Sequence, residues 1–296
     1  MKKIAIIIPY FGSWPKWFDF FLETCKHNRT IEWILFTDCD IPKNTPDNVH
    51  FNEMTMKNFE KVASKKTKVE VEIESAYKVC DFKPAYGKIF EEYLSGYDFW
   101  GWGDLDVVYG KLRKVFTPYK MNNYDIISTR RYGTSGVLSI LKNNEKIKNF
   151  YQKSPDYKKV FKNSVGYAFD ETGSFFEGRN VVGFTEVVKK QEVKYHFWDY
   201  ASTDKKVEKE KLDIYWEDGS LYDMRYGTEI ALYHFLDRKK DDKFSVQKNV
   251  KLYNKFTIQE DGIHEEKSPR IIEKKPAYIL KRRVKNRLRW IKDIFV

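Results

Sequence analysis

Two aspartates at the end of an aromatic segment are the first residues whose types and spacing could do chemistry. Asp104 and Asp106 lie in DFWGWGDLDVVYG, residues 98–110. Side chains at i and i+2 of an extended chain point the same way, so the carboxylates can converge while Leu105 turns into the core. The apolar flanks imply burial, and buried neighbouring carboxylates repel unless a cation neutralises them. We therefore expect a hard divalent cation with positions open for phosphate oxygens, although most such triplets are solvated loops.

Two carboxylates leave such a site short of a third protein ligand, and imidazole is the commonest neutral one. His234 lies in the apolar run IALYHFL, residues 230–236, and His196 lies in YHFW, residues 195–198. A lone histidine in an apolar run is more often a core residue than a ligand. From the residues alone, both histidines are candidates.

Three other stretches carry candidate groups. Asp170 and Glu171 form an acidic pair in GYAFDET, which is a candidate for chemistry or for acceptor binding; the alternative is the N-cap region of a helix. Lys83 stands just before an expected helix with Pro84 in its first turn, where it could meet an anion or be an ordinary surface lysine. The turn RRYGTSG, residues 130–136, could line a pocket, although arginines on a loop are usually solvated.

The elements that must position these residues follow a strand–helix rhythm. The expected strands span residues 3–10, 32–37 and 49–54. Helical spacing over 17–25 separates the first two, and Thr55 is a candidate N-cap for the helix after the third. This order predicts an α/β fold with a parallel sheet, in which ligands bind beyond the carboxyl ends of the strands. Tyr10, Thr37 and Asp38 fall at such ends, as do the two aspartates.

The second half of the chain predicts shorter elements. Residues 181–186 have a strand-like pattern. The segment EDGS, residues 217–220, is a hairpin signal between strands at 212–216 and 221–225, because Asp-Gly suits a tight turn.

The net charge of +11 is concentrated at the C-terminus. Residues 267–296 hold eleven Lys or Arg and two acids, which leaves +2 for the rest of the chain and argues against a nucleic-acid-binding surface. Apolar residues of this tail form one helical stripe, at Leu280, Val284, Leu288, Ile291 and Phe295. We expect a basic amphipathic helix on an anionic membrane surface; packing on the body or on a partner is the alternative. Three cysteines without metal-site spacing favour a reduced, cytoplasmic setting, and no apolar stretch reaches membrane-spanning length.

Taken together, these motifs resemble bacterial GT-A-type glycosyltransferases of capsule or lipopolysaccharide biosynthesis. The resemblance covers roughly residues 1–240 and rests on IPYFG (8–12), FTD (36–38), FKP (82–84), GDLD with the following YG (103–110), and YHF (233–235).

The resemblance implies a GT-A-like αβα sandwich and a set of roles. Asp104 and Asp106 would hold Mn²⁺ or Mg²⁺ against the donor diphosphate, and the late histidine, here His234, would complete the metal site. The remaining expected site residues are Pro9, Tyr10, Thr37 and Asp38 for the nucleoside, Lys83 and Asp104 near the phosphates, and Asp170 or Glu171 on the acceptor side, one of them the base if the reaction inverts configuration.

The implied activity is metal-dependent transfer of a sugar from a nucleotide-sugar donor, with a UDP-sugar as the expected donor, to a saccharide or lipid-linked saccharide acceptor in surface polysaccharide synthesis. We expect a catalytic domain over 1–245 and an extension over 246–296 that holds the protein on the inner face of the plasma membrane. A metal-dependent phosphodiesterase or nuclease and a non-catalytic carbohydrate-binding protein are the competing hypotheses.

Overall fold

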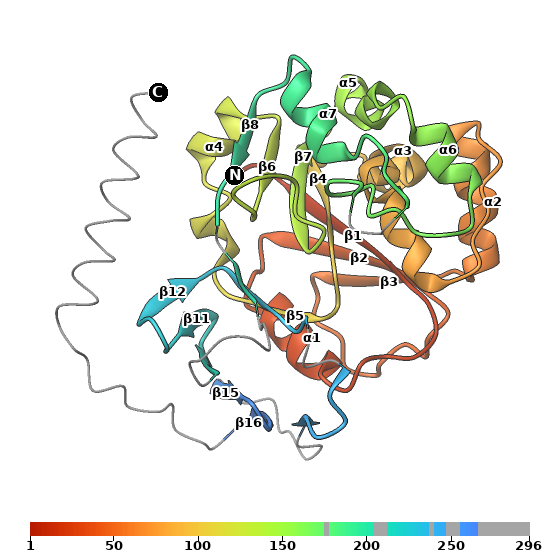
Figure 1. Cartoon of the computed structure of the whole chain (residues 1–296). Helices are drawn as coiled ribbons and strands as arrows, with labels where there is room; N and C mark the ends of the chain where they lie inside the picture. Colours follow the sequence, from red (N-terminus) through yellow and green to blue (C-terminus); the bar gives the residue numbers. More distant parts are fainter. Residues whose placement is uncertain (175–177, 200, 204–211, 237–239, 247–254, 266–296) are drawn as a thin grey trace.

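A seven-stranded sheet forms the centre of the molecule (Figure 1). The computed structural model describes residues 1–174, 178–199, 201–203, 212–236, 240–246 and 255–265. The strands run in the order β3-β2-β1-β4-β7-β6-β8, and only β7 is antiparallel to its neighbours. Their bounds are β1 Ile4–Tyr10, β2 Ile31–Thr37, β3 Val49–Glu53, β4 Phe99–Gly103, β6 Ile126–Ser128, β7 Leu138–Lys142 and β8 Tyr195–Phe197. The predicted α/β fold with a mostly parallel sheet is confirmed.

Strand β1 shows why this sheet is buried on both faces. Its alternate residues join two different cores: Ala5 and Ile7 pack on one side, and Ile4, Ile6 and Ile8 pack on the other. A strand covered on both faces reads as a continuous apolar run, as this one does.

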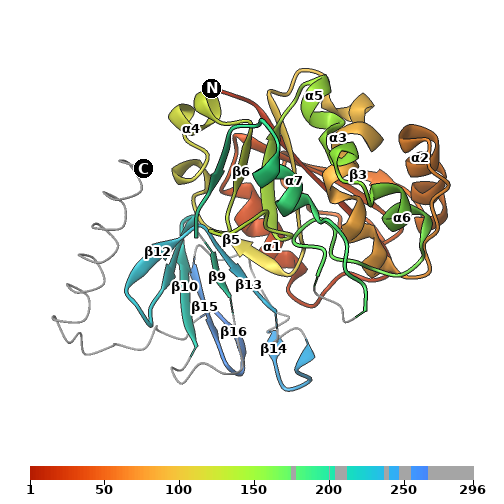
Figure 2. The ribbon, with the colours of Figure 1, turned by 45° about the horizontal axis from the view of Figure 1, so that its top comes forward.

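Helices cover both faces of the sheet (Figures 1 and 2). The core that contains Ala5 and Ile7 also receives side chains from α2, α3, α5, α6 and α7, while α1 and α4 contribute to the opposite core. The α-helices are α1 Phe18–Lys26, α2 Met56–Thr67, α3 Tyr86–Ile89, α4 Pro118–Asn123, α5 Glu145–Lys148, α6 Tyr157–Lys162 and α7 Phe184–Lys190. Single-turn and 3₁₀ segments are η1 Ala76–Ala85, η2 Glu91–Leu94, η3 Leu112–Lys114 and η4 Phe150–Lys153. Thr55 caps α2, since its hydroxyl accepts a hydrogen bond from the Asn58 amide.

A six-stranded sheet lies beside α1, in the order β12-β11-β10-β15-β16-β14 (Figure 2). Trp17 and Phe20, at the start of α1, pack into its apolar core, so that helix is held between the two sheets. The hairpin predicted at 217–220 is present, with Asp218 and Gly219 both at positive φ, as a two-residue turn requires. The strands are β10 Asp213–Glu217, β11 Ser220–Asp223, β12 Thr228–Ile230, β14 Ser245–Val246, β15 Lys255–Gln259 and β16 Gly262–His264.

A third sheet has three strands, in the order β5-β13-β9. It consists of β5 Val107–Tyr109, β9 Ala201–Thr203 and β13 Leu232–His234. This small sheet brings the segment after the two aspartates against a strand more than a hundred residues later.

One expectation from the sequence differs from the structure. Residues 181–186 do not form a strand; α7 begins at Phe184, whose ring is buried against the sheet, so a helix buries this apolar segment instead. The division between domains at residue 245 remains a prediction, but β14 crosses that point and β15 pairs with β10. The predicted amphipathic helix lies outside the described residues, and none of the described helices is long and apolar enough to span a membrane.

Candidate functional site

The turn after β4 fixes the two aspartates at the carboxyl edge of the seven-stranded sheet. The Asp104 amide donates to the Val137 carbonyl at 3.2 Å, which ties the turn to the segment before β7. Leu105 points into the core as expected, and its carbonyl accepts a hydrogen bond from the Trp17 indole at 2.8 Å. The side chain and the carbonyl of Leu105 are both held in place, and the carboxylates of Asp104 and Asp106 on either side of it converge.

Pairing between β5 and β13 brings His234 to these aspartates. His234 lies opposite Val107, and the Phe235 amide donates to the Asp106 carbonyl at 2.8 Å. The His234 Nε2 atom is 3.3 Å from Asp106 Oδ2. One ligand atom from each of Asp104, Asp106 and His234 lies within 4.8 Å of the others, and the three residues are partly exposed.

His196, the competing candidate, lies elsewhere. It is on β8 and packs against the Tyr124 ring at 5.2 Å. Burial lowers its pKa to about 4, so the ring is neutral at physiological pH without a metal. The structure therefore places His234, not His196, with the aspartates.

The donor set of this group fits a divalent metal ion. Two carboxylate oxygens and one imidazole nitrogen suit such ions, and thiolates are absent from the group. An octahedral ion with three protein ligands keeps three positions for other oxygens. Burial raises the pKa of Asp104, and the adjacent Asp106 adds to the rise while Lys83 opposes it. A divalent ion relieves this repulsion directly.

Lys83 lies beneath the aspartates rather than at the surface. Its ammonium donates to Asp104 Oδ1 at 2.6 Å and to the Gly136 carbonyl at 2.8 Å, and it is 3.4 Å from Asp170 Oδ2. The side chain is only 5 % exposed. The first two contacts are hydrogen bonds, and the third is an ion pair. Lys83 thus joins the metal-binding group to the acidic pair, and its predicted contact with phosphates would require these bonds to rearrange.

Asp170 is held in place by its own backbone. Ala168 has a left-handed φ of 52°, which is unusual for a residue with a side chain. The Asp81 carboxylate accepts hydrogen bonds from the amides of Tyr167 and Phe169, both at 2.9 Å, and the buried Lys78 neutralises Asp81 at 2.9 Å. These contacts hold the unusual turn that presents Asp170 toward Lys83.

The two acids of the pair have different surroundings. Burial raises the pKa of Asp170 to about 8, despite the opposing charge of Lys83. Glu171 is more exposed; it forms an ion pair with Arg130 at 2.9 Å and accepts a hydrogen bond from the Gly136 amide at 3.0 Å. A carboxyl that exchanges its proton near neutral pH suits acid–base chemistry, whereas a carboxylate paired with arginine suits binding.

The residues expected to bind the nucleoside lie at the ends of β1 and β2, as predicted. Pro9 and Tyr10 end β1, and the Tyr10 ring stacks on Trp14 with centroids 5.6 Å apart. Thr37 is buried and its hydroxyl accepts from the Cys39 amide, while the Asp38 carboxylate accepts from the Gly12 amide at 2.8 Å. The Asp38–Gly12 bond connects the segments that follow β1 and β2, and the nucleoside-binding role of these residues remains a prediction.

Asp81 and Lys78 are supporting residues that the sequence interpretation missed, whereas Gly136 belongs to the turn that it named as able to line a pocket. Lys78 and Asp81 are three residues apart in a short helical segment, a spacing that favours an ion pair. That signal is common on protein surfaces, so it did not distinguish this buried pair. A side chain at Gly136 would place its Cβ 2.8 Å from Asp170 Oδ2, which explains glycine at that position.

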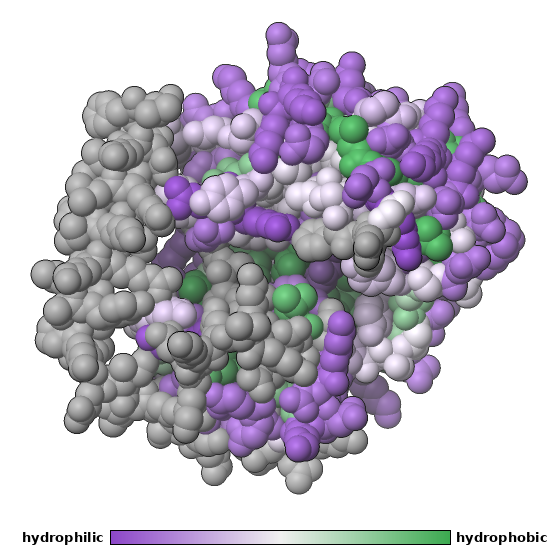
Figure 3. All heavy atoms as spheres, viewed as in Figure 1, coloured by the Kyte–Doolittle hydropathy of each residue, from purple (hydrophilic) through white to green (hydrophobic). Residues whose placement is uncertain are grey.

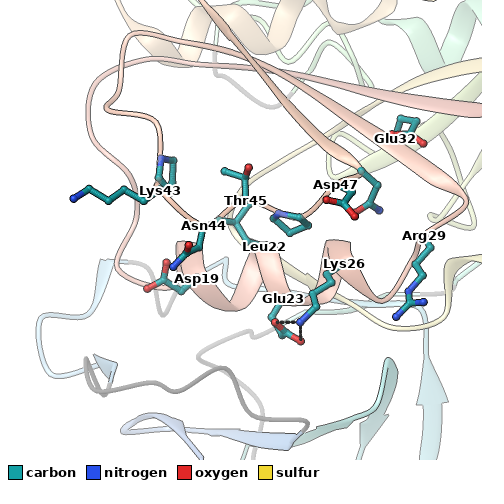
Figure 4. Close-up of a pocket in the computed structure, with 13 residues that line it drawn as sticks. Asp19, Leu22, Glu23, Lys26, Arg29, Glu32, Lys43, Asn44, Thr45 and Asp47 are labelled. Atoms are coloured by element: carbon teal, nitrogen blue, oxygen red, sulfur yellow. Dashed lines mark hydrogen bonds and ion pairs between the residues drawn. The ribbon is translucent and has the colours of Figure 1, made fainter.

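A groove also lies away from the metal-binding group, between α1 and residues 42–48 (Figure 4). Acidic and basic side chains both line it, and Lys26 forms an ion pair with Glu23 there at 3.4 Å. Within the described part of the chain, only Asp104, Asp106 and His234 form a group of three suitable metal ligands.

Comparison with solved structures finds glycosyltransferases at low sequence identity. The galactosyltransferase LgtC, in complex with donor and acceptor sugar analogues, has 9 % identity and a TM-score of 0.39, over 78 % of this chain and 87 % of that one. Mouse xyloside xylosyltransferase 1 has 11 % identity and a TM-score of 0.39, over 80 % of this chain and 98 % of that one. The glycosyltransferase GlyE of Streptococcus pneumoniae has 11 % identity and a TM-score of 0.30, over 56 % of this chain and 45 % of that one.

Comparison with curated protein sequences gives no match. A sequence family described as a family of unknown function, DUF6625, matches residues 6–267. Because this match spans most of the chain and includes the metal-binding group and the acidic pair, the protein belongs to the DUF6625 family.

Proposed function

We propose that this protein transfers a sugar from a nucleotide-sugar donor to a saccharide acceptor with the help of a divalent ion. The observation that carries the proposal is the convergence of Asp104, Asp106 and His234 at the carboxyl edge of a mostly parallel sheet. Ligands of such sheets bind at this edge. The resemblance of the surrounding motifs to GT-A-type enzymes gives the reaction class.

The chemistry of donor cleavage fits these residues. Breaking a sugar–diphosphate bond loads negative charge onto the leaving group, and a divalent ion held by Asp104, Asp106 and His234 would stabilise that charge. Lys83 adds a fixed positive charge directly behind Asp104. Its burial keeps that charge oriented, with little reorganisation during the reaction.

On the acceptor side, Asp170 is the better candidate for taking the proton of the attacking hydroxyl. Its pKa of about 8 lies near a working pH, where a general base is most efficient. Glu171, held by Arg130 and the Gly136 amide, is placed to bind hydroxyl groups and orient the sugar. Among the described residues, the two acids are therefore assigned a base and a binding role.

The finer features of the proposal come from the resemblance and from the tail. They are a UDP-sugar as donor, a lipid-linked saccharide of surface polysaccharide synthesis as acceptor, and attachment to the inner face of the plasma membrane through residues 268–296.

Flotation with anionic liposomes tests the attachment: the full chain should float, and the chain ending at residue 267 should not. Equal recovery of both forms would exclude membrane attachment through the tail.

Thermal-shift titration tests the proposed activity. UDP-, GDP- and CMP-sugars are added in turn, each with and without Mn²⁺, to the wild-type chain and to Asp106→Asn. One nucleotide class should raise the melting temperature of the wild type only when Mn²⁺ is present, and the variant should lose most of that rise. A metal-independent rise, or none with any nucleotide sugar, would refute a metal-assisted transferase.

Two further assays separate the competing hypotheses. A phosphodiesterase with two metal ions would need further carboxylates beside the first group, and the described residues supply three ligands in total. Such an enzyme would hydrolyse a generic phosphodiester such as bis-p-nitrophenyl phosphate. A non-catalytic carbohydrate-binding protein would be stabilised by saccharides without any nucleotide or metal.

A further inference from the structure

Trp17 contacts both segments that carry the metal-binding group. Its indole N–H donates to the Leu105 carbonyl at 2.8 Å, and its ring stacks on Phe235, with centroids 5.0 Å apart and planes 21° apart. Leu105 stands between the two aspartates, and Phe235 directly follows His234. The side chain of Trp17 thus touches the chain neighbours of all three candidate ligands.

A backbone hydrogen bond closes these contacts into a ring. The Phe235 amide donates to the Asp106 carbonyl at 2.8 Å, next to the pairing of β13 with β5. The turn that carries the aspartates is therefore joined to the strand that carries the histidine twice, once by backbone and once through Trp17. Because the peptide unit is planar, a hydrogen bond that holds the Leu105 carbonyl also fixes the plane from which Asp106 begins.

Trp17 is itself held firmly. Its carbonyl accepts hydrogen bonds from the amides of Phe20 and Phe21, at 3.0 and 3.1 Å, where α1 begins. Hydrophilic side chains dominate the face seen in Figure 3, whereas Trp17 is 5 % exposed and belongs to the apolar core between α1 and the six-stranded sheet. A ring in such close-packed surroundings keeps one orientation. The indole therefore offers a fixed donor to the turn.

The preceding residue, Lys16, supports Phe235 by a second route. Its ammonium donates to the Phe244 carbonyl and lies 5.3 Å from the centroid of the Phe244 ring. The Phe244 ring in turn packs against Phe235, with centroids 5.8 Å apart. Residues 16 and 17 thus both support the residue after His234, one through Phe244 and one directly.

We propose that Trp17 is a positioning residue for the divalent ion: it keeps the aspartate turn and His234 in the relative positions that the ion requires. This inference rests on the proposed function, which assigns a divalent ion to these ligands. An ion such as Mg²⁺ demands nearly ideal octahedral geometry, so small displacements of its ligands are costly. Changes to groups that orient metal ligands weaken metal binding by about 10–100-fold.

Trp216 provides a matched control, because it makes the same two kinds of contact at another place. Its indole N–H donates to the Tyr109 carbonyl at 2.9 Å, and its ring stacks on Phe256 with centroids 5.0 Å apart. Trp216 is also buried. Tyr109 ends β5, three residues after Asp106. Loss of this indole therefore removes a similar hydrogen bond from outside the turn that carries the aspartates.

The test compares Trp17→Phe with Trp216→Phe in the full chain. Phenylalanine keeps an aromatic ring for stacking but has no N–H to donate. Both variants should lose a similar amount of thermal stability without metal, since each leaves a buried carbonyl without its donor. Isothermal titration with Mn²⁺ alone should show about tenfold weaker binding by Trp17→Phe than by the wild type, and unchanged binding by Trp216→Phe.

A second pair of variants removes the stacking and keeps both indoles. Phe235→Leu and Phe256→Leu each replace the stacked ring by a smaller apolar side chain. Phe235→Leu should weaken Mn²⁺ binding, and Phe256→Leu should leave it unchanged. This pair tests the same link if a tryptophan variant does not fold.

The relative affinity for two ions separates positioning from a general loss of structure. Ca²⁺ accepts irregular ligand geometry, so Trp17→Phe should lose less affinity for Ca²⁺ than for Mg²⁺. Unchanged Mn²⁺ binding by Trp17→Phe would overturn the proposal, as would the same loss in Trp216→Phe or equal losses for Ca²⁺ and Mg²⁺. Absence of Mn²⁺ binding by the wild type would instead overturn the metal-dependent function on which the inference rests.

Discussion

Replacing Lys83 by methionine tests how the buried positive charge of Lys83 affects the stability of the fold and the binding of metal. Methionine keeps the length of the side chain but removes the ammonium that contacts Asp104, Asp170 and the Gly136 carbonyl at 2.6–3.4 Å. The Asp104 carboxylate then loses its buried counter-charge, and the buried Asp170 carboxyl loses a neighbouring ammonium. We expect two consequences, one for folding and one for metal binding, and they have opposite signs.

The folded state should become less stable. Removing one partner of a buried ion pair costs about 3–5 kcal/mol, and in a chain of this size each kcal/mol lowers the melting temperature by roughly 2 °C. The expected drop is therefore about 6–10 °C without metal. Differential scanning calorimetry measures it directly.

Metal binding should become tighter. A +1 and a +2 charge less than about 6 Å apart repel by at least about 1.4 kcal/mol even in bulk water, which corresponds to tenfold in a dissociation constant. Without Lys83, the Asp104 oxygen is also released from its hydrogen bond. Isothermal titration with Mn²⁺ alone should show at least about tenfold higher affinity for Lys83→Met than for the wild type.

Lys78 supplies the matched control. It is a second fully buried lysine, paired with Asp81 at 2.9 Å, and it contacts none of the three metal-ligand candidates. Lys78→Met should lower the melting temperature by a similar amount and leave the affinity for Mn²⁺ unchanged. Unchanged or weaker Mn²⁺ binding by Lys83→Met would refute the reasoning, since Lys83 would then not compete with the ion for Asp104.

Three further predictions follow from the geometry. The folded protein holds the Asp170 proton up to about pH 8, whereas an unfolded carboxyl loses it near pH 4, so wild-type stability should fall as pH rises through that window. Asp170→Asn should remove this loss: its melting temperature relative to the wild type should climb from pH 4 to pH 8 and then level off, and a constant difference would contradict the shift. His234→Asn should weaken Mn²⁺ binding at least about tenfold in calorimetric titration, whereas His196→Asn should leave it unchanged; the reverse order would exclude His234 as a ligand. Gly87→Ala would place a Cβ 2.3 Å from the Trp100 ring, so it should destabilise the fold by about 1–3 kcal/mol in urea titration without changing Mn²⁺ affinity.

Local pattern was enough to predict the main sheet and most of the metal-binding group. The apolar run of β1 and the strand–helix order predicted a mostly parallel sheet, because such strands are buried on both faces. The spacing of Asp104 and Asp106 predicted their convergence, since alternate residues point the same way. These features depend on neighbours in the chain, which is the information that a sequence displays directly.

Contacts between segments that are distant in the sequence decided which of the candidate residues lie together. The choice of His234 over His196 follows from the register of β13 against β5, which sets residues far apart in sequence opposite each other. The same kind of contact turned Lys83 into a buried link between Asp104 and Asp170, and tied the turn of residues 130–136 to that acid. The sequence by itself determined which residues could bind a metal or carry a proton. Their partners were decided only by the tertiary structure, because burial and charge neutralisation depend on segments that meet only after folding.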